Sequence, residues 1–119
     1  MLFWPAPRSA QRPSKGLHAQ AKLKAYSVSE LEVIDAKALE AYLPGARGLI
    51  EKAHGHPLRT ATGRVVHIEG AAPKIAAMVE WDSVEDAQAF YKSKVWTDLA
   101  PQRDKAYKLI RRYVVEVEK

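Results

Sequence analysis

The sequence predicts an α+β domain with its elements in the order β-α-β-β-α-β. Residues 25–34 and 109–118 alternate in side-chain character as strands do, and residues 74–81 form an apolar run typical of an interior strand. Apolar residues at three- and four-residue spacings indicate helices over 36–53 and from residue 84 onward. This order is the ferredoxin-like pattern, for which we expect an antiparallel four-stranded sheet with helices on one face.

The first half of the domain is predicted to be a strand followed by a long helix. In residues 25–34, alternation places apolar residues beside glutamates on one face and beside serines on the other. Asp35 is a favourable N-cap for the helix. We expect Pro44 to kink or split this helix, because proline lacks a backbone donor. We expect the helix to end at residues 54–57, where a glycine C-cap precedes a proline.

The second half is predicted to begin with an irregular strand or hairpin within residues 58–70, with a turn at 62–63. After the apolar strand, Ser83 is a predicted N-cap, and Ser93 is predicted to cap a second, short helix. Pro101 is expected to close or kink that short helix. The final alternating strand completes the sheet.

The net charge of +5 is concentrated at the N-terminus. Five of the 19 basic residues lie in residues 1–24, which contain no Asp or Glu, and they are Arg8, Arg12, Lys15, Lys22 and Lys24. The remaining basic residues balance the 14 acidic ones, so residues 25–119 are formally neutral. A nucleic-acid reader carries its basic patch on the folded domain. We therefore expect no nucleic-acid partner.

Residues 1–24 are predicted to be a disordered basic extension, followed by a single domain over residues 25–119. An organelle-targeting peptide is one interpretation of the extension, and a start-site artefact is the interpretation that we favour. The apolar run 1–4 is too short for a secretory signal. No segment approaches the roughly 18 apolar residues of a membrane span, so we expect a cytoplasmic protein without a membrane association.

The sequence predicts neither a metal site nor a cofactor. It contains no cysteine, which excludes disulfides, thiolate ligands and a cysteine nucleophile. His54 and His56 have no third ligand nearby, whereas a zinc site needs at least three protein ligands. Neither a Gly-rich phosphate loop nor a nucleophile elbow is present.

The segment from Glu80 to Arg103 carries a family resemblance. Its pattern is Glu80-Trp81 followed by Tyr91-x-Ser93-x-x-Trp96-x-x-Leu99-x-Pro101-x-Arg103. This resembles the signature of the domain-of-unknown-function 1330 family, and the resemblance extends over residues 25–118. The other agreeing pieces are Gly55-x-x-x-Arg59, Val66-x-x-Glu69-Gly70, and Asp35 with Tyr42. The departures are Phe90 for a usual Trp, Trp96 for Tyr, Trp81 for Phe, and Gly55-His56 for Gly-Gly.

The resemblance implies a dimeric α/β barrel. In that architecture two four-stranded sheets face each other and helices cover the outside. The first strand then needs no solvent face, because one of its faces packs on helices and the other lines the interface with the partner sheet. The resemblance implies a fold and a homodimer but no reaction, because such folds host many unrelated functions.

Five residues are candidate ligand contacts: Arg59, Glu80, Tyr91, Trp96 and Arg103. Glu80 ends a buried strand and is a candidate general acid or base, although a structural ion pair with one of the arginines is the interpretation that we favour. Each arginine can bind a carboxylate with its planar fork or tie helix to sheet. Tyr91 and Trp96 share a pocket only if the chain turns between them. His54 is a second, weak candidate base.

Three functions stay open at this point. The leading hypothesis is a homodimer that binds a small anionic or aromatic molecule between sheet and helices. The second is a cofactor-independent enzyme, such as a monooxygenase, isomerase or dehydratase, with Glu80 or His54 as base. The third is a structural or regulatory interaction module without a small-molecule ligand.

Overall fold

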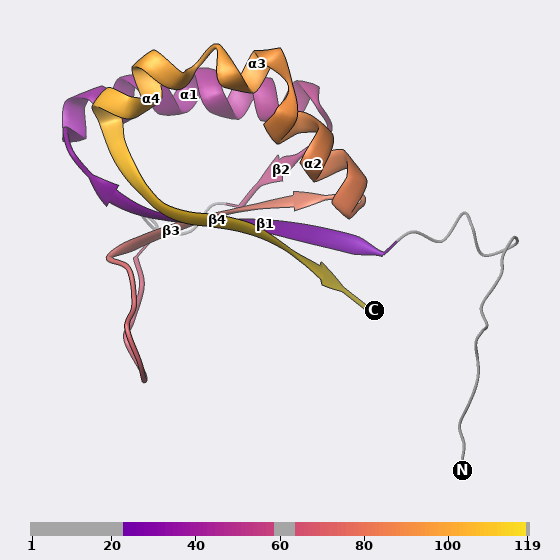
Figure 1. Cartoon of the computed structure of the whole chain (residues 1–119), viewed down its shortest axis with the longest axis horizontal. Helices are drawn as coiled ribbons and strands as arrows, with labels where there is room; N and C mark the ends of the chain where they lie inside the picture. Colours follow the sequence, from indigo (N-terminus) through magenta and orange to yellow (C-terminus); the bar gives the residue numbers. More distant parts are fainter. Residues whose placement is uncertain (1–22, 59–63, 119) are drawn as a thin grey trace, which may run out of the picture.

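The computed structural model describes residues 23–58 and 64–118, and its elements follow the predicted order (Figure 1). They are β1 (Lys24–Val33), α1 (Ala36–Lys52), β2 (His56–Pro57), β3 (Ile75–Trp81), α2 (Val84–Lys92), α3 (Lys94–Thr97), α4 (Ala100–Ala106) and β4 (Tyr107–Val117). Apart from Leu23 and Lys24, the predicted N-terminal extension lies outside the described residues, as does the predicted turn at 62–63.

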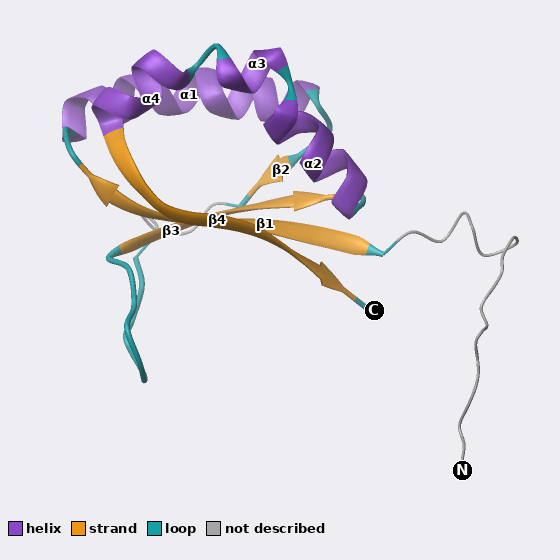
Figure 2. Ribbon diagram, viewed as in Figure 1, coloured by secondary structure: helices purple, strands orange, loops and turns teal. Residues whose placement is uncertain are grey.

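The strands form one antiparallel sheet in the order β2-β3-β1-β4, and the helices cover one of its faces (Figure 2). The predicted α+β, ferredoxin-like fold is therefore confirmed. On β1, Ser27, Ser29 and Leu31 are buried beneath the helices. Because side chains alternate along a strand, Tyr26 and Val28 lie on the other side, which we call the open face. Between Glu30 and Leu31 the pairing of β1 with β4 is shifted by a β-bulge.

Helix α1 begins as predicted and continues past Pro44 as a single helix. The Asp35 carboxylate accepts hydrogen bonds from the backbone N–H groups of Lys37 and Ala38, at 3.0 and 3.1 Å. The expected split at Pro44 does not occur, and one helix runs from Ala36 to Lys52. Pro44 is on the exposed side, where water can bond the carbonyl that the proline leaves without its usual backbone donor.

The glycine after α1 is required for packing rather than for its backbone angle. At this end of α1 the residue with positive φ is His54, at 70°. A Cβ at Gly55 would lie 2.9 Å from the Trp81 ring and 2.7 Å from the Ile50 side chain. The expected glycine C-cap is therefore wrong, because His54 takes the positive φ. Gly55 instead lets the end of α1 pack closely against the indole ring of Trp81.

The second strand lies earlier than predicted. Residues 64–70 form no strand, and the pairing there is a single bridge between Arg64 and Ile75. The strand beside β3 is β2. The apolar residues of the predicted strand are not buried: Val66 is 61% exposed and Ile68 is 79% exposed. Burial therefore does not stabilise a strand at this position. In Figure 1 this segment extends away from the sheet on the side opposite the helices.

The crossover from β3 to β4 contains three consecutive helices. Ser83 accepts from the backbone N–H of Asp86 at 3.1 Å, and Ser93 accepts from that of Trp96 at 3.3 Å, so both predicted caps are confirmed. Pro101 does not end a helix; it lies in the first turn of α4, where its missing N–H would have no helical partner. Strand β4 consequently begins at Tyr107.

Two clusters of buried side chains lie between the helices and the sheet. The first contains Trp81, Phe90 and Trp96 and lies under α2 and α3. The second contains Leu31, Tyr42 and Tyr107 and joins α1 to β4. Residues of both clusters line the cavity described next.

Candidate functional site

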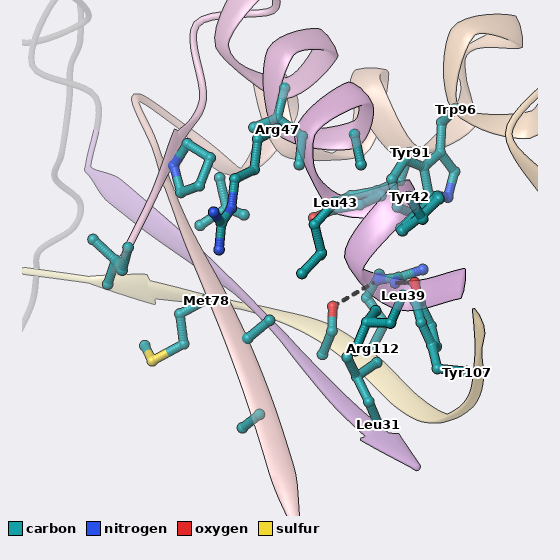
Figure 3. Close-up of a pocket in the computed structure, with 18 of the residues that line it drawn as sticks. Leu31, Leu39, Tyr42, Leu43, Arg47, Met78, Tyr91, Trp96, Tyr107 and Arg112 are labelled. Atoms are coloured by element: carbon teal, nitrogen blue, oxygen red, sulfur yellow. Dashed lines mark hydrogen bonds between the residues drawn. The ribbon is translucent and has the colours of Figure 1, made fainter. Parts of the chain in front are cut away.

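A cavity of about 420 Å³ lies between α1 and the helix-facing side of the sheet (Figure 3). Its walls are mainly apolar and include Leu31, Leu39, Leu43, Ile50 and Val79. Sites for small molecules commonly measure about 300–1,000 Å³ and have such walls with a few placed polar groups. The cavity therefore has the size and the lining of a small-molecule site.

Arg112 of β4 places a cation at one end of this cavity, and Arg47 of α1 is the other arginine in the lining. Its Nε donates to Ser29 Oγ at 2.8 Å, and its Nη2 donates to the Tyr107 hydroxyl at 2.9 Å. The guanidinium carbon lies 4.7 Å from the ring centroid of Trp96 and 5.2 Å from that of Tyr91. No carboxylate in the described part of the chain forms an ion pair with Arg112.

Tyr91 and Trp96 converge because Ser93 ends α2 and starts α3. Their ring centroids are 5.1 Å apart and their planes are perpendicular. The Tyr91 hydroxyl forms a 2.8 Å hydrogen bond with Ser27 Oγ, which also accepts from Trp81 Nε1 at 3.1 Å. Burial raises the pKa of Tyr91, so the phenol stays protonated at neutral pH. Both rings line the cavity, as walls with fixed orientations.

Arg103 acts on the cavity through Trp96. Its Nη1 donates to the Trp96 carbonyl at 3.0 Å, and its guanidinium carbon lies 4.2 Å from the indole centroid. It ties α4 to α3 rather than helix to sheet, and it is not among the residues that line the cavity. Two arginines thus contact one tryptophan, with cation–π geometry in both cases.

Tyr42 brings a buried hydroxyl without a hydrogen-bond partner among the described residues. Its side chain is 5% exposed, and its ring lies 6.0 Å from that of Tyr107. Burial raises the pKa of Tyr42 well above the usual range; Tyr107 adds to the rise, and the nearby Arg103 guanidinium opposes it. A buried donor without an acceptor costs about 1–3 kcal/mol.

The other candidate residues do not join this group. Glu80 alternates with the buried Val79 and Trp81, lies on the open face, and accepts a 3.2 Å hydrogen bond from the Tyr26 hydroxyl. Glu80 forms no ion pair with Arg103 within residues 23–58 and 64–118.

His54 lines a separate hollow between α1 and α2 together with Asp82. Arg59 lies outside the described residues.

The sequence prediction missed Arg112, Ser29 and Tyr107 as parts of one group. The alternation of β4 could have identified Arg112, because Arg112 and Val114 are two residues apart and therefore face the same side of the sheet. The hydrogen bond from Arg112 to Ser29 spans 83 residues. Its existence depends on the register between β1 and β4, which local patterns do not supply.

The fold and the cavity define a class: a small ferredoxin-like α+β protein with an aromatic-walled site between helix and sheet. Within that class, the chain belongs to the family called domain of unknown function DUF1330, whose model matches residues 24–117. The resemblance in the Glu80–Arg103 segment is therefore confirmed.

Solved structures show the same fold at low identity. A protein of unknown function from Rhodopseudomonas palustris is 14% identical with a TM-score of 0.59, over 91% of this chain and 95% of its own. SnoaB, a cofactor-independent oxygenase from Streptomyces nogalater, is 8% identical with a TM-score of 0.59, over 82% of this chain and 95% of its own. These likenesses establish the fold alone. No curated protein shows significant sequence similarity to this chain.

The described residues contain neither a membrane-spanning helix nor a metal-binding cluster. No helix among them combines the length and the apolar character needed to cross a membrane. No group of three or more histidine, aspartate or glutamate side chains in the same part of the chain is arranged to hold a metal ion.

Proposed function

We propose that this protein binds a small anionic or aromatic molecule in the cavity between α1 and the sheet. The observation that carries the proposal is a half-buried guanidinium, that of Arg112, beside aromatic rings in a cavity with apolar walls. Protein interiors are close-packed, and filling a void with side chains stabilises a fold. A cavity of this size is therefore better explained by a ligand than by packing.

A thermal-shift screen with a metabolite panel tests this function. A ligand present at 100 times its Kd stabilises the folded state by about 2.7 kcal/mol. Leu43→Trp places a larger side chain in the cavity wall and should abolish the stabilisation. Ala41→Trp, on the exposed side of the same helix, is the matched control and should preserve it.

Two outcomes of that screen count against the proposal. If no compound raises the melting temperature of the unmodified protein, the interaction-module hypothesis is favoured. If Leu43→Trp responds as fully as Ala41→Trp, the ligand binds outside the cavity.

We also propose that two copies associate through their open faces. Tyr113 and Val115 lie opposite Val28 and Tyr26 in the ladder between β4 and β1, and they are 42% and 45% exposed. Helices cover the other face of the sheet (Figure 2). A second sheet would bury these apolar side chains, as the family resemblance implies.

A cofactor-independent enzyme is the second candidate function. SnoaB, which shares the fold, is an oxygenase of that kind. The two bases expected for such a reaction, Glu80 and His54, both lie outside the cavity beside Arg112. Ligand binding is for this reason the better supported function.

A further inference from the structure

We propose that the ligand is a planar, mainly apolar carboxylate, and that Arg112 binds its carboxylate at the polar end of the cavity. This inference rests on the proposed function and names the class of molecule that the cavity accepts. It follows from the unused donors of Arg112, from the way that its side chain is held, and from the charges around it.

Arg112 has donors to spare, and two of them share one edge. A guanidinium carries five N–H donors. The bonds to Ser29 and Tyr107 use Nε and one hydrogen of Nη2. Both hydrogens of Nη1 and the second hydrogen of Nη2 have no hydrogen-bond partner in the described part of the chain. These two nitrogens form the end of the fork, which matches the two oxygens of a carboxylate.

The side chain of Arg112 is held in place before any ligand arrives. Ser29 and Tyr107 fix one edge of the guanidinium, and the rings of Tyr91 and Trp96 lie beside it. Trp96 is held in turn by Arg103. A donor group that is already oriented loses little conformational entropy on binding, and this favours affinity.

The charges around Arg112 favour a single carboxylate over a more highly charged group. Arg103 lies on the same tryptophan but uses a donor on the Trp96 carbonyl. The charged side chains that α1 contributes to the cavity are Glu40 and Arg47, which have opposite signs and are both exposed. The surroundings of Arg112 are otherwise phenols, an indole and a serine.

The rest of the ligand would lie against apolar walls. Leu39 and Leu43 come from α1, and Ala77 and Val79 come from β3. In Figure 3 the labelled leucines of α1 and the side chain of Arg112 border the same space. A ligand with a flat hydrocarbon body between helix and sheet would contact the apolar walls, and its carboxylate would bind Arg112.

Isothermal titration calorimetry with naphthoate and naphthamide tests the inference. The two probes share a ring system and differ in the charge of the head group. We expect naphthoate to bind the unmodified protein about tenfold or more tightly than naphthamide, because hydrogen bonds between two charged groups are stronger than those to a neutral amide. Arg112→Gln should remove this preference, so that naphthoate binds no more tightly than naphthamide.

Two matched variants control for the loss of one positive charge. Arg111→Gln changes the neighbouring residue, which is paired with Glu30. Arg47→Gln removes the other arginine that lines the cavity. Both should retain the preference for naphthoate. If Arg112→Gln does not fold by circular dichroism, Arg112→Lys keeps the charge without the fork, and we expect it to lose most of the preference.

The outcomes separate this inference from the proposed function. Equal affinity of the unmodified protein for both probes would overturn the carboxylate assignment and leave cavity binding intact. If neither probe binds, but a compound without a carboxylate gives stabilisation that Leu43→Trp abolishes, the carboxylate assignment also fails and cavity binding stays intact. If Arg47→Gln removes the preference and Arg112→Gln does not, Arg47 binds the anion and the assignment to Arg112 is wrong. If nothing binds, both proposals fail.

Discussion

The two faces of the sheet treat two adjacent arginines differently. On the open face, Arg111 forms a 3.0 Å ion pair with Glu30, which also accepts a 2.9 Å hydrogen bond from the Tyr113 hydroxyl. On the helix face, Arg112 has hydroxyl partners and aromatic neighbours but no carboxylate among the described residues. One face neutralises its cation within the chain, and the other leaves a cation for a ligand. The two arginines carry the same charge, and they differ in their partners: Arg111 has a carboxylate and Arg112 has hydroxyl groups.

The largest expected effect comes from a charge placed on the open face. Val28→Asp should convert the proposed dimer to a monomer, because an unpaired carboxylate buried in an interface costs about 3–5 kcal/mol. Light scattering at micromolar concentration measures the change. Ala41→Asp, on the exposed side of α1, should leave the mass at that of a dimer. A monomeric unmodified protein at this concentration would refute the face-to-face assembly.

Removing a hydroxyl should matter more on the helix face than on the open face. Ser27→Ala should lower the free energy of unfolding by about 1–3 kcal/mol, because Trp81 Nε1 and the Tyr91 hydroxyl lose a buried partner. Tyr26→Phe, which loses the bond to Glu80 on the open face, is the comparison and should change stability less. Urea unfolding measures both, and equal losses would contradict the contrast between the faces.

The smallest expected effect is a gain in stability. Tyr42→Phe removes a buried hydroxyl without a partner in the described residues, and should raise the free energy of unfolding by about 1 kcal/mol at neutral pH. Urea unfolding measures this change too. A loss of stability would show that the hydroxyl has a partner in solution.

The same variant should also alter the dependence of stability on pH. Burial raises the pKa of Tyr42 in the folded state, so above a pH of about 10 the unfolded state loses its phenolic proton first. The folded state then binds more protons than the unfolded state, and stability falls as the pH rises. Tyr42→Phe should lose less stability than the unmodified protein between about pH 9 and 11.

The sequence predicts the fold well where local chemistry decides it. The caps at Asp35, Ser83 and Ser93 each need one side chain and a backbone N–H two or three residues away. The prediction at Pro101 is wrong because proline suits the first turn of a helix as well as the position after its end. The strand expected within 64–70 is wrong because alternation alone does not provide a partner strand.

The candidate site is only half predictable for a related reason. Tyr91 and Trp96 are five residues apart, and a cap between them brings their rings together. Arg112 and Ser29 are far apart in the chain and meet through the pairing of two strands. Glu80 lies near the end of β3, and its place in the alternation puts it on the open face. Local patterns identify the aromatic wall and miss the cation.

The β-bulge between Glu30 and Leu31 determines which of the two adjacent arginines of β4 faces the cavity. Leu31 pairs with Leu109, and Glu30 pairs with Arg111, so Ile110 is the extra residue on β4. If Ile110 took the place opposite Glu30, Arg111 would fall opposite Ser29 and face the helices, and Arg112 would turn to the open face. Because Ile110 stands outside the regular pairing, Arg112 and the other helix-facing side chains of β4 keep their side of the sheet. Removing Ile110 altogether would leave Glu30 opposite Arg111 and Ser29 opposite Arg112, so the bulge lets a strand that is one residue longer keep the same arginine at the cavity.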